Sequence, residues 1–328
     1  MPLSLYWGTV SAVGERLEEL IRCEVDGTPC IAYPRQTGDV EVGDVVLVNG
    51  QARSLELGSG GYDILYANLT RGLRLPADDG AHVMALPYTP AQSAYRTVEE
   101  AGPLAESLGG MPVVCCGLHS QIAPACAGIG AAKRVAYVQL GGGALPVSLS
   151  NLVRALKQKG LVEMAVAVAP CYDGDAQAVT VASALAWAKA GSFDAVVCGI
   201  GPGIVGTGSK LGHGGMAVAE AVNATAALGG RAIVALRYSG GDPRERHQGV
   251  SHHTRAALRL CLGAREIAWP VGLVKPGWHE PVTDIAVDDW MEACAGLPLS
   301  HMGRAPADDP WFFAAAFAAG RLARRYLG

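Results

Sequence analysis

The sequence lacks the features that mark secreted, membrane-bound and nucleic-acid-binding proteins. Only 17% of its 328 residues are charged and the net charge is −4, so no basic field predicts nucleic acid or an anionic membrane as a partner. No uninterrupted apolar run approaches the length of a membrane span, and residues 1–7 have neither the basic nor the apolar part of a signal peptide. We therefore expect a cytoplasmic protein.

Cysteine pairs with metal or redox spacing are also missing. The nine cysteines are odd in number and scattered, and none forms a C-x-x-C pair. Several lie in apolar runs, such as those that hold Cys115, Cys116 and Cys198. The pattern argues against a disulfide framework and predicts reduced, buried thiols.

The chain is rich in apolar residues and in glycine. Half of its residues are apolar, and 328 residues are enough for a large core and two domains. The 43 glycines follow no triplet period, which excludes collagen and predicts tight turns and close approach of a ligand to the backbone.

Residues 1–105 predict a small β-barrel domain followed by a connector or lid. Turn residues such as Asp26-Gly27 and Asn49-Gly50 separate short β-rich runs. The expected strands are 5–10, 20–25, 28–33, 45–49, 62–69 and 82–86. A closed barrel leaves no exposed edge, whereas the alternative is a flat meander packed on the second domain.

Residues 106–328 predict a Rossmann-like α/β domain with a helical C-terminal tail. Nearly continuous apolar runs alternate with helical segments, which indicates a mainly parallel sheet covered by helices on both faces. The expected strands are 112–117, 134–140, 163–169, 194–200, 231–237 and 266–269, and the expected helices are 120–131, 146–159, 175–190, 213–228 and 251–262. Right-handed crossovers then bring every strand–helix loop to one edge of the sheet.

The tail is expected to form a helix that Asp309 caps and Pro310 begins. Trp311, Phe312 and Phe313 make it apolar. One interpretation is a core helix that closes the fold, and the alternative is the contact face of a homodimer.

Polar and glycine-rich segments follow five of the six predicted strands, at 118–121, 141–146, 171–175, 201–210 and 237–254. In open α/β sheets ligands bind outside the carboxyl ends of the strands, so these segments predict the site.

The glycine-rich loop 201–210 is one candidate wall of that site. It matches G-x-G-x-x-G but no helix follows at once, so the match does not predict a dinucleotide fold. Its backbone N–H groups and hydroxyls could hold a phosphate or carboxylate, and the alternative is a structural turn. The anion-binding candidates here are Gly201, Gly203, Gly206, Thr207, Gly208 and Ser209.

Residues 237–254 are the other wall and hold three of the eight histidines. Arg244 and Arg246 offer planar donors for an anion, and Ser251 is expected to cap a helix whose amino end favours negative charge. The alternative is a hydrogen-bonded loop in which arginine and aspartate pair with one another.

Three histidines are candidates for proton transfer: His252 and His247 in this segment, and His119 at the start of an earlier helix. Asp242 and His253 are candidate ligands for a divalent metal such as Zn²⁺, although no H-E-x-x-H or other strong metal spacing is present. The sequence identifies no cofactor.

Four motifs resemble those of an uncharacterised bacterial family, one of the domains of unknown function. They are Leu118-His119-Ser120-Gln121, Ala144-Leu145-Pro146, the segment 201–208 (GPGIVGTG) and the segment 246–254 (RHQGVSHHT). The resemblance runs the length of the chain and implies no particular activity. The family pattern has Thr-Asp-Gly before Ala144, where this chain has three glycines.

The leading hypothesis is an enzyme of hydrolase or transferase type that acts on a small anionic or phosphorylated metabolite at the carboxyl edge of the sheet. The alternative is a non-catalytic nucleotide or metabolite sensor that uses the same pocket. A structural homo-oligomer is the third hypothesis.

Overall fold

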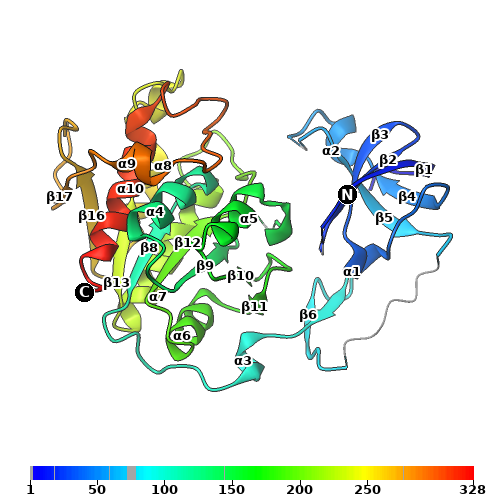
Figure 1. Ribbon diagram of the computed structural model, residues 1–328, viewed down its shortest axis with the longest axis horizontal. Coiled ribbons are helices and arrows are strands. Elements are labelled where there is room, and N and C mark those ends of the chain that lie inside the picture. Colours follow the sequence, from blue (N-terminus) through cyan, green and yellow to red (C-terminus); the bar gives the residue numbers. More distant parts are fainter. Residues whose placement is uncertain (1–2, 18, 59, 72–78, 144, 276) are drawn as a thin grey trace. The chain divides into compact units, whose positions relative to one another are not determined.

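The computed structural model describes residues 3–17, 19–58, 60–71, 79–143, 145–275 and 277–328 (Figure 1). The chain forms two compact units, Met1–Asp79 and Gly80–Gly328. The expected domain boundary was at residue 105, so the connector falls in the larger unit. Ala144, in one of the motifs above, lies outside the described residues.

The smaller unit is a closed five-stranded barrel. Its strands follow the order β1-β2-β3-β5-β4, and β1 also pairs with β4 to close it. They are β1 (Leu5–Arg16), β2 (Ile21–Val25), β3 (Thr28–Ala32), β4 (Val45–Asn49) and β5 (Asp63–Asn68), with short helices α1 (Pro34–Thr37) and α2 (Gln51–Ser54). Val10, Val46 and Val48 are fully buried inside it. The predicted barrel is confirmed.

The sixth strand expected in the barrel lies elsewhere. β6 (Val83–Ala85) pairs with β7 (Ser93–Tyr95) as a separate two-stranded hairpin, which α3 (Val98–Ala101) follows. These elements belong to the larger unit.

The larger unit is built on an eight-stranded sheet in which every pair of neighbours is parallel. The strand order is β11-β10-β9-β12-β8-β13-β16-β17. Its strands are β8 (Pro112–Cys116), β9 (Val135–Leu140), β10 (Met164–Val168), β11 (Ala176–Ala178), β12 (Ala195–Ile200), β13 (Arg231–Ala235), β16 (Arg265–Pro270) and β17 (Thr283–Ile285). The predicted Rossmann-like sheet is confirmed. The three-residue edge strands β11 and β17 were not expected.

Helices cover both faces of this sheet (Figure 1). Because successive strand residues point to opposite faces, Val114 packs on one layer and Val113 on the other. The first layer contains α4 (Ile122–Ile129), α5 (Asn151–Gln158), α9 (Trp290–Ala293) and α10 (Pro310–Arg324); the second contains α6 (Val181–Ala190), α7 (Ala217–Ala227) and α8 (His252–Leu258).

Helix α6 begins later than expected. The predicted helix 175–190 starts at Val181, because residues 176–178 pair with β10 as β11. Thr180 caps it by accepting a hydrogen bond from Ser183 N, whereas Asp175 binds Ala165 N and Lys157.

The tail helix α10 is a core helix. Phe312, Phe313 and Phe317 are fully buried against the sheet and α4. The two helices approach so closely that a Cβ on Gly320 would lie 2.0 Å from the carbonyl oxygen of Ala125. Phe312 and Phe313, which carried the alternative expectation of a dimer face, are buried within the chain.

All nine cysteines are buried and free, as predicted. Among the described residues, no helix combines the length and apolarity needed to cross a membrane.

Candidate functional site

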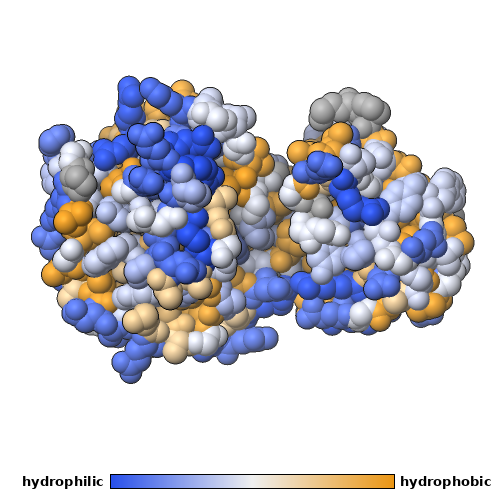
Figure 2. All heavy atoms as spheres, turned by 90° about the horizontal axis from the view of Figure 1, so that it is seen from above, coloured by the Kyte–Doolittle hydropathy of each residue, from blue (hydrophilic) through white to orange (hydrophobic). Residues whose placement is uncertain are grey.

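The loops at the carboxyl ends of the central strands meet one another. His119, just after β8, lies 3.0 Å from the carbonyl oxygen of Ile200 at the end of β12. Gln121 donates to Leu236 O after β13 at 2.8 Å. The loops after β9 and β12 touch at Gly142 and Gly214, where a Cβ on either would overlap the other's backbone. Figure 2 views this end of the larger unit and shows hydrophilic side chains gathered on it.

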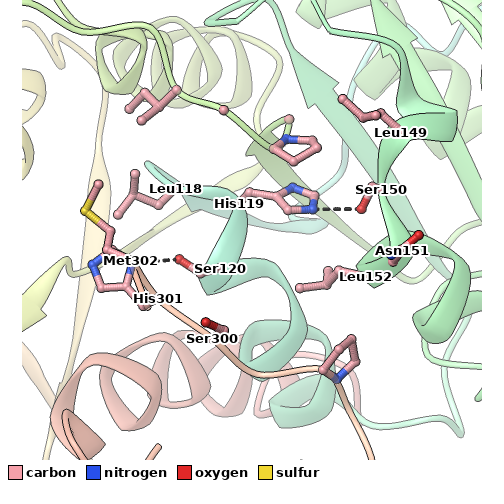
Figure 3. A pocket seen from close by; sticks show the side chains of 15 residues that line it. Leu118, His119, Ser120, Leu149, Ser150, Asn151, Leu152, Ser300, His301 and Met302 are labelled. Carbon is pink, nitrogen blue, oxygen red and sulfur yellow. Dashed lines mark hydrogen bonds between the residues drawn. The ribbon is translucent and has the colours of Figure 1, made fainter. Parts of the chain in front are cut away.

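An open pocket of about 530 Å³ lies between these loops, and we call it the edge pocket (Figure 3). The segment before α10 supplies its opposite side. The lining residues are Leu118, His119, Ser120, Leu149, Ser150, Asn151, Leu152, Gly201, Pro202, Gly203, Ile204, Pro298, Ser300, His301 and Met302.

A serine–histidine pair lies on one side of the edge pocket. His119 Nε2 is 2.7 Å from Ser150 Oγ (Figure 3). A carbonyl oxygen can only accept, so Ile200 O requires the proton of the neutral ring on Nδ1. Nε2 is then the acceptor for the Ser150 hydroxyl. Burial lowers the pKa of His119 to about 4, so the ring is neutral at physiological pH.

Local structure holds Ser150 in place. It follows the 3₁₀ turn η2 (Val147–Leu149) and caps α5, because its Oγ accepts a hydrogen bond from Val153 N at 3.0 Å. The hydroxyl therefore accepts from the helix and donates to His119. Ser150 is 2% exposed, and these two hydrogen bonds fix the orientation of its hydroxyl.

A second serine–histidine pair lies across the pocket. Ser120 Oγ is 3.1 Å from His301 Nδ1. The His301 ring stacks on Phe312, with centroids 3.8 Å apart and planes 3° from parallel. Burial, followed by the charges of Arg237 and Arg304, lowers the pKa of His301 to about 3.

Four further histidines gather where β13, η3 (Gly214–Met216) and α8 meet. We call His213, His247, His252 and His253 the histidine cluster. The rings of His213 and His253 stack with centroids 3.6 Å apart, and the centroids of His252 and His253 lie 4.4 Å apart. The centroid of His247 lies 4.9 Å from those of His252 and His253.

Hydrogen bonds fix two rings of the cluster. His247 Nδ1 lies 2.7 Å from Ser251 Oγ, and Ser251 also caps α8, as predicted, by accepting from His253 N at 3.2 Å. His253 Nδ1 accepts a hydrogen bond from Arg237 Nη1 at 2.9 Å. Within the described parts of the chain, His252 Nε2 is buried without a hydrogen-bond partner.

Beside the cluster, Asp242 is buried in a network of arginines. Arg244 donates to both of its carboxylate oxygens at 2.9 Å, and Arg304 Nη2 lies 3.1 Å from Oδ2. Arg237 Nη2 is 3.9 Å away. These hydrogen bonds, Arg244 first, hold the pKa of Asp242 below its usual range. Since both of its carboxylate oxygens already accept hydrogen bonds from arginines, Asp242 is poorly placed to bind a metal.

The network carries an excess of positive charge. Arg304 also pairs with the buried Asp309, so three guanidinium groups meet two carboxylates. Burial lowers the pKa values of His247 to about 3 and of His253 to about 2, with Arg237 among the further causes for both. Burial likewise lowers the pKa of His252. The region combines neutral imidazoles with a net positive charge.

The loop 201–210 divides between two environments. Gly201 and Gly203 line the edge pocket. The predicted anion-binding residues Gly206, Thr207, Gly208 and Ser209 instead lie in an exposed turn, where Thr207 Oγ1 binds Ser209 Oγ and Gly212 O. Arg246 is exposed, and its Nε is 3.5 Å from His247 Nε2.

Several site residues were given no role from the sequence. Ser150 lies four residues beyond the predicted glycine-rich segment 141–146, and its position before a helix was the further signal. His301 and Arg304 follow none of the predicted strands, so they were not expected at the carboxyl edge of the sheet. A histidine and an arginine close together in a turn before an apolar helix were the available signal.

Comparison with known proteins identifies a family without an assigned activity. No similar curated protein and no similar solved structure was found. A family model described as "protein of unknown function (DUF3866)" matches residues 29–320. Because the match covers most of the chain and the whole parallel sheet, the chain belongs to the DUF3866 family.

Proposed function

We propose that the protein is an enzyme of hydrolase or transferase type, which acts on a small anionic or phosphorylated metabolite in the edge pocket. The observation that carries the proposal is the Ser150–His119–Ile200 arrangement. It joins a hydroxyl, a neutral base and a group that fixes the tautomer of the base, which is the geometry of an activated nucleophile.

In the proposed first step, Ser150 Oγ attacks an acyl or phosphoryl centre of the substrate while His119 Nε2 takes the hydroxyl proton. The bond to the leaving group breaks, and the leaving group takes that proton from His119. In the second step water or an acceptor hydroxyl attacks the ester on Ser150, again losing its proton to His119. Ser150 recovers the proton as the product leaves.

The positive charge beside the edge pocket supports an anionic substrate. Met302, in the pocket wall, lies with its sulfur 2.8 Å from Arg244 Nη2, so the arginine network borders the edge pocket. The excess positive charge of that network attracts an anion towards the pocket. The pocket volume of about 530 Å³ suits a small metabolite.

A serine-reactive organophosphorus probe tests the nucleophile directly. We expect covalent labelling of Ser150, identified by mass spectrometry of peptides, and loss of labelling in His119→Gln. Ser150→Asn is the matched variant, because asparagine caps a helix as well as serine but has no hydroxyl. It should remain folded and unlabelled.

Ser120 is the internal control, since it faces the same pocket and bonds to a histidine. Labelling of Ser120 in place of Ser150, or labelling of Ser150 that persists in His119→Gln, contradicts the proposed roles. A panel of phosphate monoesters and small carboxylate esters then measures turnover. Saturable binding of these anions without labelling or turnover supports a sensor instead.

A further inference from the structure

The histidine cluster supports a second site that the proposed function does not use. We propose that His247, His252 and His253 bind one divalent transition-metal ion, with Zn²⁺ the best match to an all-imidazole set. This inference does not depend on the Ser150–His119 pair.

The three histidines are close enough to share one ion. One ring nitrogen from each of the three histidines lies within 4.8 Å of the others. Nitrogens bound to a tetrahedral zinc at about 2.0–2.1 Å lie roughly 3.4 Å from one another, so small side-chain rotations are enough to close the set. Three imidazoles with a fourth position open is a common arrangement for zinc that retains a water or anion.

One ring nitrogen of His252 lacks a hydrogen-bond partner among the described residues. Within the described residues, His252 Nε2 is buried and bonds to nothing, although burying a polar atom without a partner costs free energy. A metal ion accepts the lone pair of such a nitrogen. The three ring centroids form a triangle: that of His247 lies 4.9 Å from those of His252 and His253, which are 4.4 Å apart.

Neighbouring side chains orient two of the three rings. Ligand histidines usually bond through their second nitrogen to an oriented oxygen, and the Ser251 hydroxyl stands 2.7 Å from His247 Nδ1. His213 stacks on His253 and restricts the rotation of that ring. These contacts orient the rings of two proposed ligands before an ion arrives, and only small rotations remain to close the set.

Two arginines oppose the ion. Arg246 Nε lies 3.5 Å from His247 Nε2, the nitrogen that the Ser251 hydrogen bond leaves for the ion. The Arg237 guanidinium occupies the lone pair of His253 Nδ1 at 2.9 Å. An ion that takes this lone pair must displace that hydrogen bond, and Asp242, whose Oδ2 is 3.9 Å from Arg237 Nη2, is the alternative partner for the arginine. The lone pair is already directed at a positive group, which is the orientation that a cation needs.

Calorimetric titration of untagged, chelator-treated full-length protein with Zn²⁺ tests the site. We expect one ion per chain. His252→Gln should weaken binding by more than roughly a hundredfold, beyond the 10–100-fold typical for loss of a second-shell partner, and Ser251→Ala should fall within that smaller range. His82→Gln is the matched control, because His82 is an exposed histidine in the same unit. It should bind as the wild type does.

X-ray absorption of the zinc-loaded wild-type protein keeps the test decisive if a variant fails to fold. Three imidazole nitrogens at about 2.0–2.1 Å support the site, whereas sulfur at about 2.3 Å assigns the ion to the cysteines and overturns the proposal. Absence of stoichiometric binding, or equal binding by the wild type and a folded His252→Gln, also overturns it. Neither readout involves serine labelling, so failure here leaves the proposed catalytic pair untouched.

Discussion

Acid should destabilise the larger unit through His301. This ring is 3% exposed and stacked on Phe312, and its pKa is lowered to about 3 against 6.5 for a free histidine. Between these two values the unfolded chain binds a proton at this residue and the folded chain does not. Stability contributed by the neutral ring is therefore present above about pH 6.5 and is lost as the pH falls towards 3.

The size of the effect follows from the pKa difference. At about pH 5 the unfolded ring is some 1.5 pH units below its own pKa, and each unit corresponds to about 1.36 kcal/mol. His301 alone should thus remove about 2 kcal/mol of unfolding free energy between about pH 7.5 and pH 5. Other buried histidines add to the total loss, so the contribution of His301 has to be isolated by a difference.

Urea unfolding of the wild type and His301→Gln, each at the two pH values, isolates it. Tryptophan fluorescence reports mainly on the larger unit, which contains five of the six tryptophans. We expect the variant to be less stable at about pH 7.5 but to lose about 2 kcal/mol less than the wild type on acidification. Equal losses in the two proteins would falsify the assignment of His301 as a buried neutral ring.

Three further predictions concern other parts of the structure. Gly320→Ala should lower the free energy of unfolding in urea by more than about 2 kcal/mol, because its Cβ would lie 2.0 Å from Ala125 O. The control Gly208→Ala places a Cβ that meets nothing within 4 Å, so it should change that free energy by less than about 0.5 kcal/mol. Similar values for the two variants would refute the close helix crossing. Asp242→Asn should cost about 3–5 kcal/mol by leaving the buried Arg237 and the partly buried Arg244 and Arg304 short of a counter-charge, and a neutral result would show that this network is not buried in solution. Labelling of Ser150 should persist down to about pH 5 and decline near the lowered pKa of His119, about 4, whereas a midpoint near 6.5 would mean that His119 is exposed to water.

Much of the fold could be predicted from local patterns. Buried parallel strands are nearly continuous apolar runs, so all six long strands of the sheet were located from the sequence. β11 and β17 were missed because three-residue edge strands carry too few side chains to show a pattern. The helix predicted over 175–190 began too early for the same reason, since residues 176–178 pair with β10 through a long-range contact.

The site was predictable only where it follows the strands. His119, Gly201 and Gly203 were expected at the carboxyl edge and line the edge pocket. A capping role for Ser150 is visible locally, but its bond to His119 joins residues 31 positions apart in the chain. His301 reaches Ser120 across 181 positions, and only the packing of α10 brings them together.

The docking of α10 has a consequence for the order in which the site can form. His301, Arg304 and Asp309 all lie in the segment that leads into this helix, and Asp309 accepts from Gly240 N at 3.0 Å after β13. During synthesis, the first strands and their loops leave the ribosome long before α10 exists to cover them. Contacts this distant in sequence form late. A chain halted before residue 300 would lack α10 on one face of the sheet and the Ser300, His301 and Met302 wall of the edge pocket, while His119 and Ser150 would already be present.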